Sequence, residues 1–351
     1  MFVRKNFSLR GLMIFSGGHL VWMTAWATIV AAYFTFTHHA DFRIPWLPIS
    51  LIGTAVAFYV GFKNNSAYDR LWEARKIWGA IVNSSRMWAT TAKAFVNDQT
   101  SAVAVSTGEL AIIHKDLLYR HIAWLYALRS QLLIPTPWEH INQNRLIRMT
   151  TKKRMKQFGV GLLHDGTTEE QLSRYLEKNE METVINFQNT ATQIIDNQSQ
   201  RLKELRAQGL IDDFRHMELQ NILNDFYTHQ GKCERIKKFP LPRQYGGMSF
   251  IFVGIFIFLL PFGLVSEFVS LAEGTALEGF GGWLSIPFTV LVSWIYLVME
   301  LVGDYSENPF EGMGNDIPML ALCRTIEIDL KEMLGEKDLP PKIQSVNGVL
   351  M

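Results

Sequence analysis

The sequence predicts an all-α protein that crosses a membrane four times and carries a large helical region between its second and third spans. Four segments are apolar and long enough to cross a hydrocarbon core of about 30 Å. Lys and Arg gather on one side of these segments. The block between residues 63 and 240 is too long for a loop, and its apolar residues recur at helical spacing without the alternation of strands.

The four predicted spans are the segments from about residue 11 to 36, 45 to 62, 248 to 265 and 283 to 302. The first is too long for a signal peptide and lacks a small-residue cleavage pattern, so we interpret it as a span. The second is the shortest, and its length would also suit a buried core helix. The fourth contains no charged residue before Glu300.

Basic residues predict how the spans are oriented. They precede the first span, follow the second and precede the third. The loop between the first two spans has only Arg43, and the loop between the last two has no basic residue but carries Glu267, Glu273 and Glu278. We therefore expect both termini and the long middle region to be cytoplasmic. The expected divisions are a cytoplasmic N-terminal helix with spans one and two (1–62), a cytoplasmic helical domain (63–240), spans three and four (241–303) and a cytoplasmic C-terminal segment (304–351).

Within the middle region, helical patterns run over residues 109–133, 181–210 and 212 to about 237. Pro135 ends the first pattern and Pro240 ends the last. After residue 334, glycine and prolines predict a loose extension.

Composition excludes several functional classes. The formal net charge of +1 gives no reason to expect a nucleic-acid partner. Cys233 and Cys323 lie far apart without metal-ligand spacing, as in a reduced intracellular protein. Nucleotide-binding, nucleophile-elbow and zinc-protease motifs are absent from the sequence, so no catalytic residue is predicted. His114 and His121 are seven residues apart and could share a helix face, either as structural residues or as metal ligands.

The second span carries the first candidate site. Ser50, Thr54, Phe58 and Phe62 recur every four residues, so they lie on one stripe of a helix. The stripe is either a pore wall, in which the phenylalanines form an apolar constriction, or an aromatic ridge inside a packed helix bundle.

The second candidate site follows the fourth span. Proline and glycine in residues 307–318 predict a tight, non-helical stretch just inside the membrane. The side chains of Asn308 and Asp316 could coordinate a hard cation. Alternatively, these oxygens could cap the helix that begins after Asp316.

Two runs resemble signatures of the bestrophin family. Phe58-Tyr59-Val60, followed by Tyr68-Asp69-Arg70-Leu71-Trp72-Glu73-Ala74-Arg75 and Trp78-Gly79, resembles the bestrophin signature after the second span. Asn308-Pro309-Phe310 resembles that family's Asn-Pro-Phe element. The resemblance extends over essentially the whole chain, and the compact size is similar to that of the bacterial members.

This resemblance implies a homopentameric ion channel of the bacterial inner membrane, with one pore on the fivefold axis. Carried over by position, its narrow apolar neck would be formed by Thr54, Phe58 and Phe62. Many members have a larger apolar side chain where this chain has Thr54, so that ring would be wider and more polar here. Residues 219–225 resemble the helix at the family's cytoplasmic exit, which places Met217 at a second constriction.

The resemblance also bears on cofactors and partners. Animal bestrophins bind calcium through a run of acids after Asn-Pro-Phe, and this chain lacks the run. Asn308 and Asp316 match the calcium clasp, but the charge count is low for tight binding, so we expect that no cofactor is required and that calcium does not bind tightly. The expected partners are other copies of the chain, the lipid bilayer and small monovalent ions.

The permeant ion and one alternative function stay open at the level of sequence. The resemblance favours chloride and other anions, whereas an apolar neck does not by itself fix the sign of the ion. Glu273 and Glu278 would favour cations if they line the entrance. The alternative function is a membrane-anchored scaffold or regulator whose cytoplasmic helices bind a partner.

Overall fold

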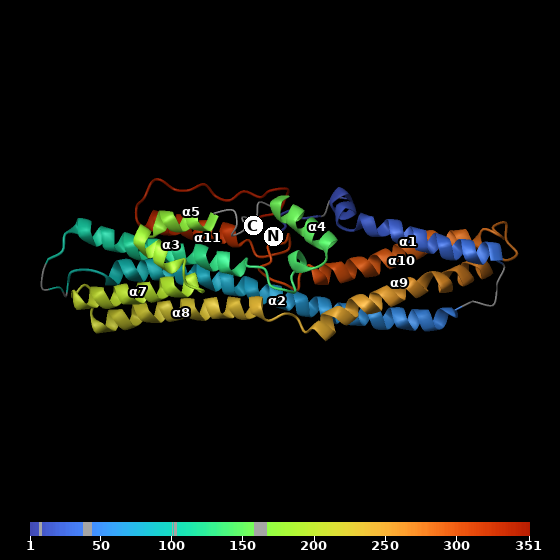
Figure 1. The fold of residues 1–351 in the computed structure, drawn as a ribbon, viewed down its shortest axis with the longest axis horizontal. Helices are drawn as coiled ribbons and strands as arrows, with labels where there is room; N and C mark the ends of the chain where they lie inside the picture. Colours follow the sequence, from blue (N-terminus) through green and yellow to red (C-terminus); the bar gives the residue numbers. More distant parts are fainter. Residues whose placement is uncertain (7–8, 38–43, 100, 102–103, 158–166) are drawn as a thin grey trace. The chain divides into compact units, whose positions relative to one another are not determined.

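The fold is built from α-helices. A computed structural model of the chain describes residues 1–6, 9–37, 44–99, 101, 104–157 and 167–351. Over these residues the only β structure is two isolated bridges, so the all-α prediction is confirmed for the described part of the chain (Figure 1). The helices form two compact units. The first, called the span unit, comprises Arg4–Asp69 and Pro240–Asn308, and the second, called the helical unit, comprises Met1–Val3, Arg70–Phe239 and Pro309–Met351.

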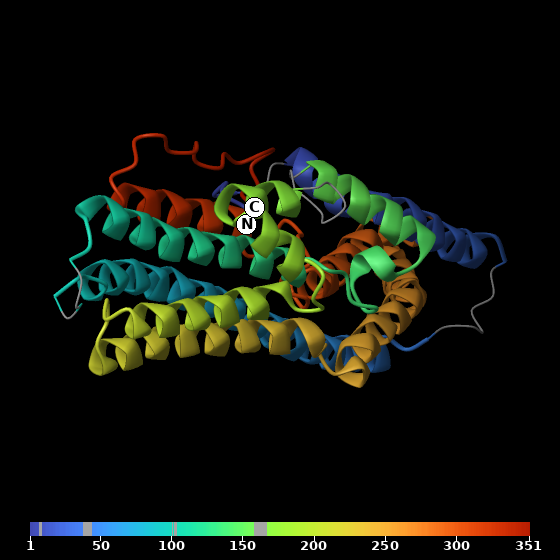
Figure 2. The same ribbon diagram turned by 60° about the vertical axis from the view of Figure 1, so that its left-hand side comes forward.

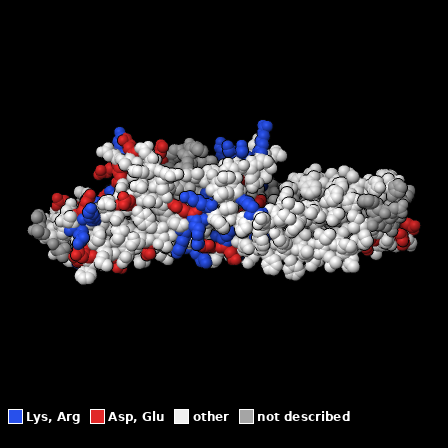
Figure 3. All heavy atoms as spheres, turned by 60° about the horizontal axis from the view of Figure 1, so that its bottom comes forward, with Lys and Arg blue, Asp and Glu red and all other residues white. Residues whose placement is uncertain are grey.

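The span unit contains the four apolar helices that the sequence predicts. Each is long and apolar enough to cross a membrane. On the face drawn in Figure 3, the described surface over these helices is almost free of charged side chains, apart from carboxylates at one end. The second of these helices continues far beyond the predicted span, and its later turns belong to the helical unit. The helices are α1 (Leu9–Thr37), α2 (Trp46–Phe95), α9 (Arg243–Ala272) and α10 (Gly281–Asp304).

Small residues let α2 and α9 pack closely. A side chain on Gly53 of α2 would meet the ring of Phe256 of α9 at 2.7 Å, and one on Gly263 of α9 would meet Ile49 of α2 at 2.6 Å. Close approach at small residues is the usual means of packing helices in lipid, where no hydrophobic driving force acts between them. The interface is therefore held by shape complementarity, and a larger side chain at either glycine would separate the helices.

The helical unit is a bundle of long helices with short helices beside it (Figures 1 and 2). Phe226 is fully buried in its core. The centroid of its ring lies 6.4 Å from the ring centroid of Trp88 and 4.9 Å from that of Trp124. Besides the later turns of α2, the unit contains α3 (Thr107–Leu132), η2 (His140–Asn142), α4 (Arg145–Gln157), α5 (Thr167–Tyr175), α6 (Lys178–Val184), α7 (Thr190–Ala207), α8 (Asp213–Lys238) and α11 (Met319–Met333).

Two local predictions were wrong. The single helix predicted over residues 181–210 is two helices, because α6 ends at Val184 and Asn189 caps α7 by accepting a 3.0 Å hydrogen bond from the Thr192 N–H. The segment after residue 334 is not loose. Arg324 donates a 2.9 Å bond to the carbonyl oxygen of Pro341, and the Leu350 N–H donates a 2.8 Å bond to the carbonyl oxygen of Met1. The C-terminal segment is thus part of the helical unit.

His114 and His121 are structural residues. The Nε2 atom of His114 lies 2.9 Å from the carbonyl oxygen of Val96, and that of His121 lies 2.9 Å from the hydroxyl of Ser85. Within the described residues, no group of three His, Cys, Asp or Glu side chains could hold a metal ion. Burial lowers the pKa of His121 to about 3, because a charged imidazole would be desolvated against the core rings.

We expect His121 to weaken the protein in mild acid. Its pKa is about 3 in the folded state and 6.5 when exposed, so between these values the unfolded chain binds the extra proton and the free energy of unfolding falls as the pH falls. The slope approaches ~1.4 kcal/mol per pH unit within that window. Thermal unfolding in detergent at pH 7 and pH 5 measures it. His121→Gln should show a smaller loss between the two pH values, and an unchanged loss would contradict this assignment.

Candidate functional site

The helix α2 presents two different faces in the span unit. Its inner face is buried and contains Ile49, Val56 and Val60. The opposite face carries the stripe identified in the sequence, on which Phe58 is 67% and Phe62 64% exposed. The stripe is therefore not a ridge packed inside a single chain, and it is available to line a pore, contact another copy or face lipid.

The exposed stripe has no fixed charge. Thr54 donates its hydroxyl hydrogen to the carbonyl oxygen of Ser50 at 2.9 Å, and Ser50 donates to that of Leu47 at 2.8 Å. The hydroxyl oxygens of the stripe and the two phenylalanine rings share this face with exposed apolar residues, including Leu47 at 69% and Leu51 at 63% exposure. Residues 46–62 contain no Lys, Arg, Asp, Glu or His, so an ion passing here would meet an apolar surface with a few hydrogen-bond acceptors.

A buried ion pair lies directly behind the stripe. Lys63 follows Phe62 in the chain but points to the inner face, where its ammonium group pairs with Glu300 of α10. The side chains are 2% and 3% exposed. Ser249 of α9 donates a hydrogen bond to the other carboxylate oxygen of Glu300. One charge cluster thus joins three helices of the span unit.

Further polar contacts fix the inner face of α2. Tyr296 of α10 donates a 3.0 Å hydrogen bond to the carbonyl oxygen of Gly53. Asn64 donates a 2.8 Å bond to the carbonyl oxygen of Met299, and Tyr59 donates a 3.2 Å bond to that of Tyr245. These bonds hold α2 in one rotation about its axis. With the inner face held, Phe58 and Phe62 must project from the opposite side.

Sequence reasoning missed this ion pair. In the sequence, Lys63 is one of the basic residues after the second span that indicate orientation, and Glu300 is the first charged residue of the fourth span. Ionisable groups within membrane helices usually pair, because an isolated charge is costly there. The sequence did contain a signal for this pair. The two residues have opposite charges, and they lie at the ends of two apolar segments that border the same compartment.

The proposed exit residue Met217 lies on an exposed face of α8. It is 64% exposed, and Phe214, one turn earlier, is 86% exposed. Asn221, one turn later, is also exposed. The N-terminal turns of α8 thus present two large apolar side chains away from the core of the helical unit.

Asp316 does not cap the helix that follows it, so the capping interpretation was wrong. The helix α11 begins at Met319, and its N-cap residue, Pro318, makes no side-chain capping hydrogen bond. Buried Asp316 instead accepts hydrogen bonds from the N–H groups of Phe310 at 2.9 Å, Gly312 at 2.7 Å and Ile317 at 2.7 Å. Burial raises the pKa of its carboxyl, against the opposing effect of these donors. Asp316 therefore holds the loop in shape and has both oxygens engaged.

Asn308, the other residue of this candidate site, belongs to the span unit. It is 9% exposed, and neither its amide oxygen nor its nitrogen has a hydrogen-bond partner among the described residues. Its polar atoms are thus buried without the compensation that such groups normally have.

The loop that Asp316 holds is tied to η2 by buried charges. Lys237, in the last turn of α8, pairs with Glu139 and donates a 3.2 Å bond to the carbonyl oxygen of Phe310. The backbone N–H of His140 donates a 2.6 Å hydrogen bond to the carboxylate of Glu311, and the ring Nδ1 of His140 lies 2.9 Å from the same carboxylate. Burial raises the pKa of Glu139 to about 7, although Lys237 acts in the opposite direction.

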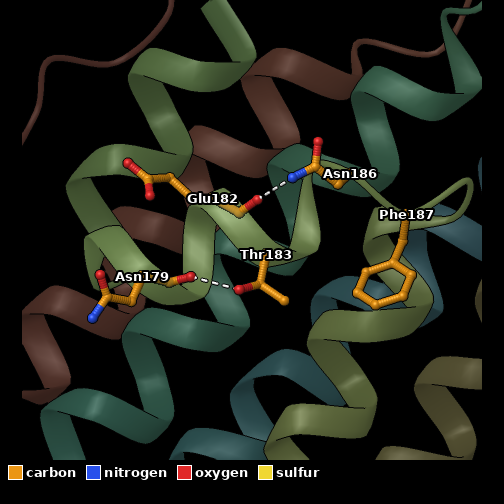
Figure 4. A pocket seen from close by; sticks show the side chains of 5 residues that line it. All are labelled: Asn179, Glu182, Thr183, Asn186 and Phe187. Carbon is orange, nitrogen blue, oxygen red and sulfur yellow. Dashed lines mark hydrogen bonds between the residues drawn. The ribbon is translucent and has the colours of Figure 1, made fainter.

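A hollow of about 500 Å³ lies on the surface beside α6 (Figure 4). Two of its polar side chains already bond their own helix, Thr183 to the carbonyl oxygen of Asn179 at 2.8 Å and Asn186 to that of Glu182 at 2.6 Å. The hollow is open to solvent and has no convergent set of polar groups, so it does not offer a ligand site comparable to the stripe.

The comparison with protein families decides the identity. The family model of bacterial and fungal bestrophin proteins matches residues 7–332. The chain belongs to the bestrophin family. This confirms the resemblance seen in the sequence, and with the four apolar helices it makes this bestrophin a multi-pass membrane protein.

Individual relatives agree with the assignment. This bestrophin is 26% identical over 321 residues to the voltage-dependent anion channel-forming protein YneE of Escherichia coli K12, covering 88% of this chain and 87% of that one. It is 28% identical over 296 residues to the voltage-dependent anion channel-forming protein mll4386 of Mesorhizobium japonicum, covering 84% and 77%. These relatives are named for channel formation, and the prediction that the chain is not an enzyme is confirmed.

A solved structure shares the fold. The bacterial bestrophin homologue from Klebsiella pneumoniae superposes with a TM-score of 0.71 at 21% identity, covering 92% of this chain and 99% of that one. At this identity the likeness establishes the fold alone.

Proposed function

We propose that this bestrophin is a homopentameric channel that conducts small monovalent anions, chloride above all, across the bacterial inner membrane, with both termini in the cytoplasm. The observation that carries the proposal is the uncharged, exposed stripe of α2, held outward by buried bonds on its inner face. One chain cannot enclose a pore with such a stripe. Copies related by rotation would bring their stripes together around the axis.

The proposal assigns positions along the ion path. Thr54 would form the widest ring of the neck, Phe58 and Phe62 an apolar constriction, and Met217 the cytoplasmic exit. An aromatic ring has a negative face and a positive edge, so rings directed edge-on at the axis would attract anions without a fixed charge. Asn308 and Asp316 have no part in this path.

The names of the relatives support anions as the permeant class. Relatives that share about a quarter of their residues with this chain are named for anion-channel formation. The carboxylates of Glu273 and Glu278 lie on the exposed loop between α9 and α10 and would oppose anions only if they border the pore entrance.

Chloride flux from liposomes tests the proposal against a scaffold function. Purified protein is reconstituted into liposomes loaded with KCl, and valinomycin is added so that potassium can follow. We expect rapid chloride release that depends on the protein. Release no faster than from empty liposomes would favour the membrane-anchored scaffold.

Light scattering of the detergent-solubilised protein should give five chain masses, and a monomer mass would contradict the enclosed pore.

A further inference from the structure

The helix α4 is strongly basic and has no acidic residue. Its 13 residues include six Lys or Arg and no Asp or Glu. Lys152, Lys153 and Lys156 are exposed, and none of them has an ion-pair partner in the described part of the chain. The basic residues are Arg145, Arg148, Lys152, Lys153, Arg154 and Lys156.

Two large apolar side chains of α4 lie among its basic residues. Leu146 is 78% and Met149 60% exposed, and their spacing of three places them together on one face. The helix packs through its opposite side, where Thr151 and Met155 are 1% and 2% exposed. Leu146 and Met149 therefore contribute nothing to the core of the helical unit.

An exposed face with apolar residues flanked by lysines matches one kind of partner. Helices of this type lie in the interface of a bilayer, with their apolar side chains among the acyl chains and their cations on anionic headgroups. Each Lys or Arg near an anionic surface adds to the attraction.

The covalent chain keeps this helix near a bilayer. Glu139, the residue before η2, pairs with Lys237, which is six residues before the first residue of α9. Six residues span about 20 Å when fully extended. His140 bonds Glu311, seven residues after the last residue of α10. Because α9 and α10 cross the membrane, η2 and the helix after it cannot move far from its surface.

We propose that α4 lies on the bilayer surface and binds anionic phospholipids, with Leu146 and Met149 inserted beside the headgroups and Lys152, Lys153 and Lys156 on their phosphates. This contact adds a lipid-binding surface to the helical unit and does not depend on ion conduction.

A fluorescent label on Met149→Cys tests the contact in the full-length protein. Both native thiols, Cys233 and Cys323, are buried, so an NBD dye reacts at the new site. The labelled protein is placed in nanodiscs of phosphatidylcholine alone or mixed with phosphatidylglycerol, with spin-labelled lipid as quencher. We expect blue-shifted emission and at least about twofold stronger quenching with phosphatidylglycerol, because charge draws the helix to the surface.

Matched variants complete the test. The substitutions Lys152→Gln, Lys153→Gln and Lys156→Gln together should abolish the response to phosphatidylglycerol. A label on Lys203→Cys, an exposed position of α7, should not respond to lipid charge. Absence of quenching, or equal quenching in both lipids, would overturn the proposal. Blue-shifted emission without quenching by the spin-labelled lipid would also overturn it and would place this face between copies of the chain.

Discussion

Replacing Phe58 and Phe62 together by alanine is expected to raise the single-channel conductance severalfold. The two rings are the largest side chains on the exposed stripe of α2. In the proposed pore their removal would widen an apolar constriction that ions cross only when it is wetted. Single-channel recording in planar bilayers measures the change. Phe250→Ala is the matched control, because Phe250 is 64% exposed on α9, outside the stripe.

A second substitution distinguishes the effect of the size of the Phe58 ring from the effect of its charge distribution. Phe58→Ile keeps the position apolar but removes the positive ring edge. If ring edges attract the permeant anion, this variant should lower the ratio of anion to cation permeability. Conductance that is the same in the wild type and the double alanine variant would place the constriction elsewhere, and an unchanged permeability ratio in Phe58→Ile would remove the role of the ring edge.

Replacing Glu300 by alanine is expected to destabilise the protein more than any substitution on the stripe. It would leave the Lys63 ammonium buried beside α10 without a counter-charge, and breaking a buried pair in this way costs about 3–5 kcal/mol. The double variant Lys63→Met with Glu300→Gln should recover most of the loss, because it removes both charges and keeps an acceptor for Ser249. Thermal unfolding in detergent measures each variant.

A surface ion pair provides the control for this cycle. Arg86 and Asp329 in the helical unit form a 2.7 Å pair whose side chains are 47% and 25% exposed. Breaking it with Asp329→Ala should cost no more than about 1 kcal/mol. A Glu300→Ala variant as stable as the wild type, or a double variant no better than the single one, would show that the buried pair does not hold α2 in place.

The sequence predicted the spans well because apolar length is a local property. It missed the length of α2, since the charges after Phe62 mark the end of the apolar segment and not the end of the helix. It also missed the break before α7, although asparagine is favoured at helix N-caps and disfavoured inside helices, so Asn189 was an available local signal for a new helix start.

The candidate site was predictable only in part. Spacing of four residues identified Thr54, Phe58 and Phe62 as one stripe, but its exposure depends on which face of α2 packs. The partner of Lys63 is 237 residues away in the chain, and no local pattern encodes that distance. Asp316 was misread because aspartate accepts backbone hydrogen bonds equally well in loops and at helix ends.

The reversal potential of the current tests the central claim most directly. Purified protein is fused into a planar bilayer with unequal KCl concentrations on the two sides. If the protein is an anion channel, as we expect, the current reverses near the equilibrium potential of chloride. That potential is opposite in sign to the equilibrium potential of potassium. Reversal near the potassium potential would identify a cation channel, and the absence of protein-dependent current would contradict the channel altogether.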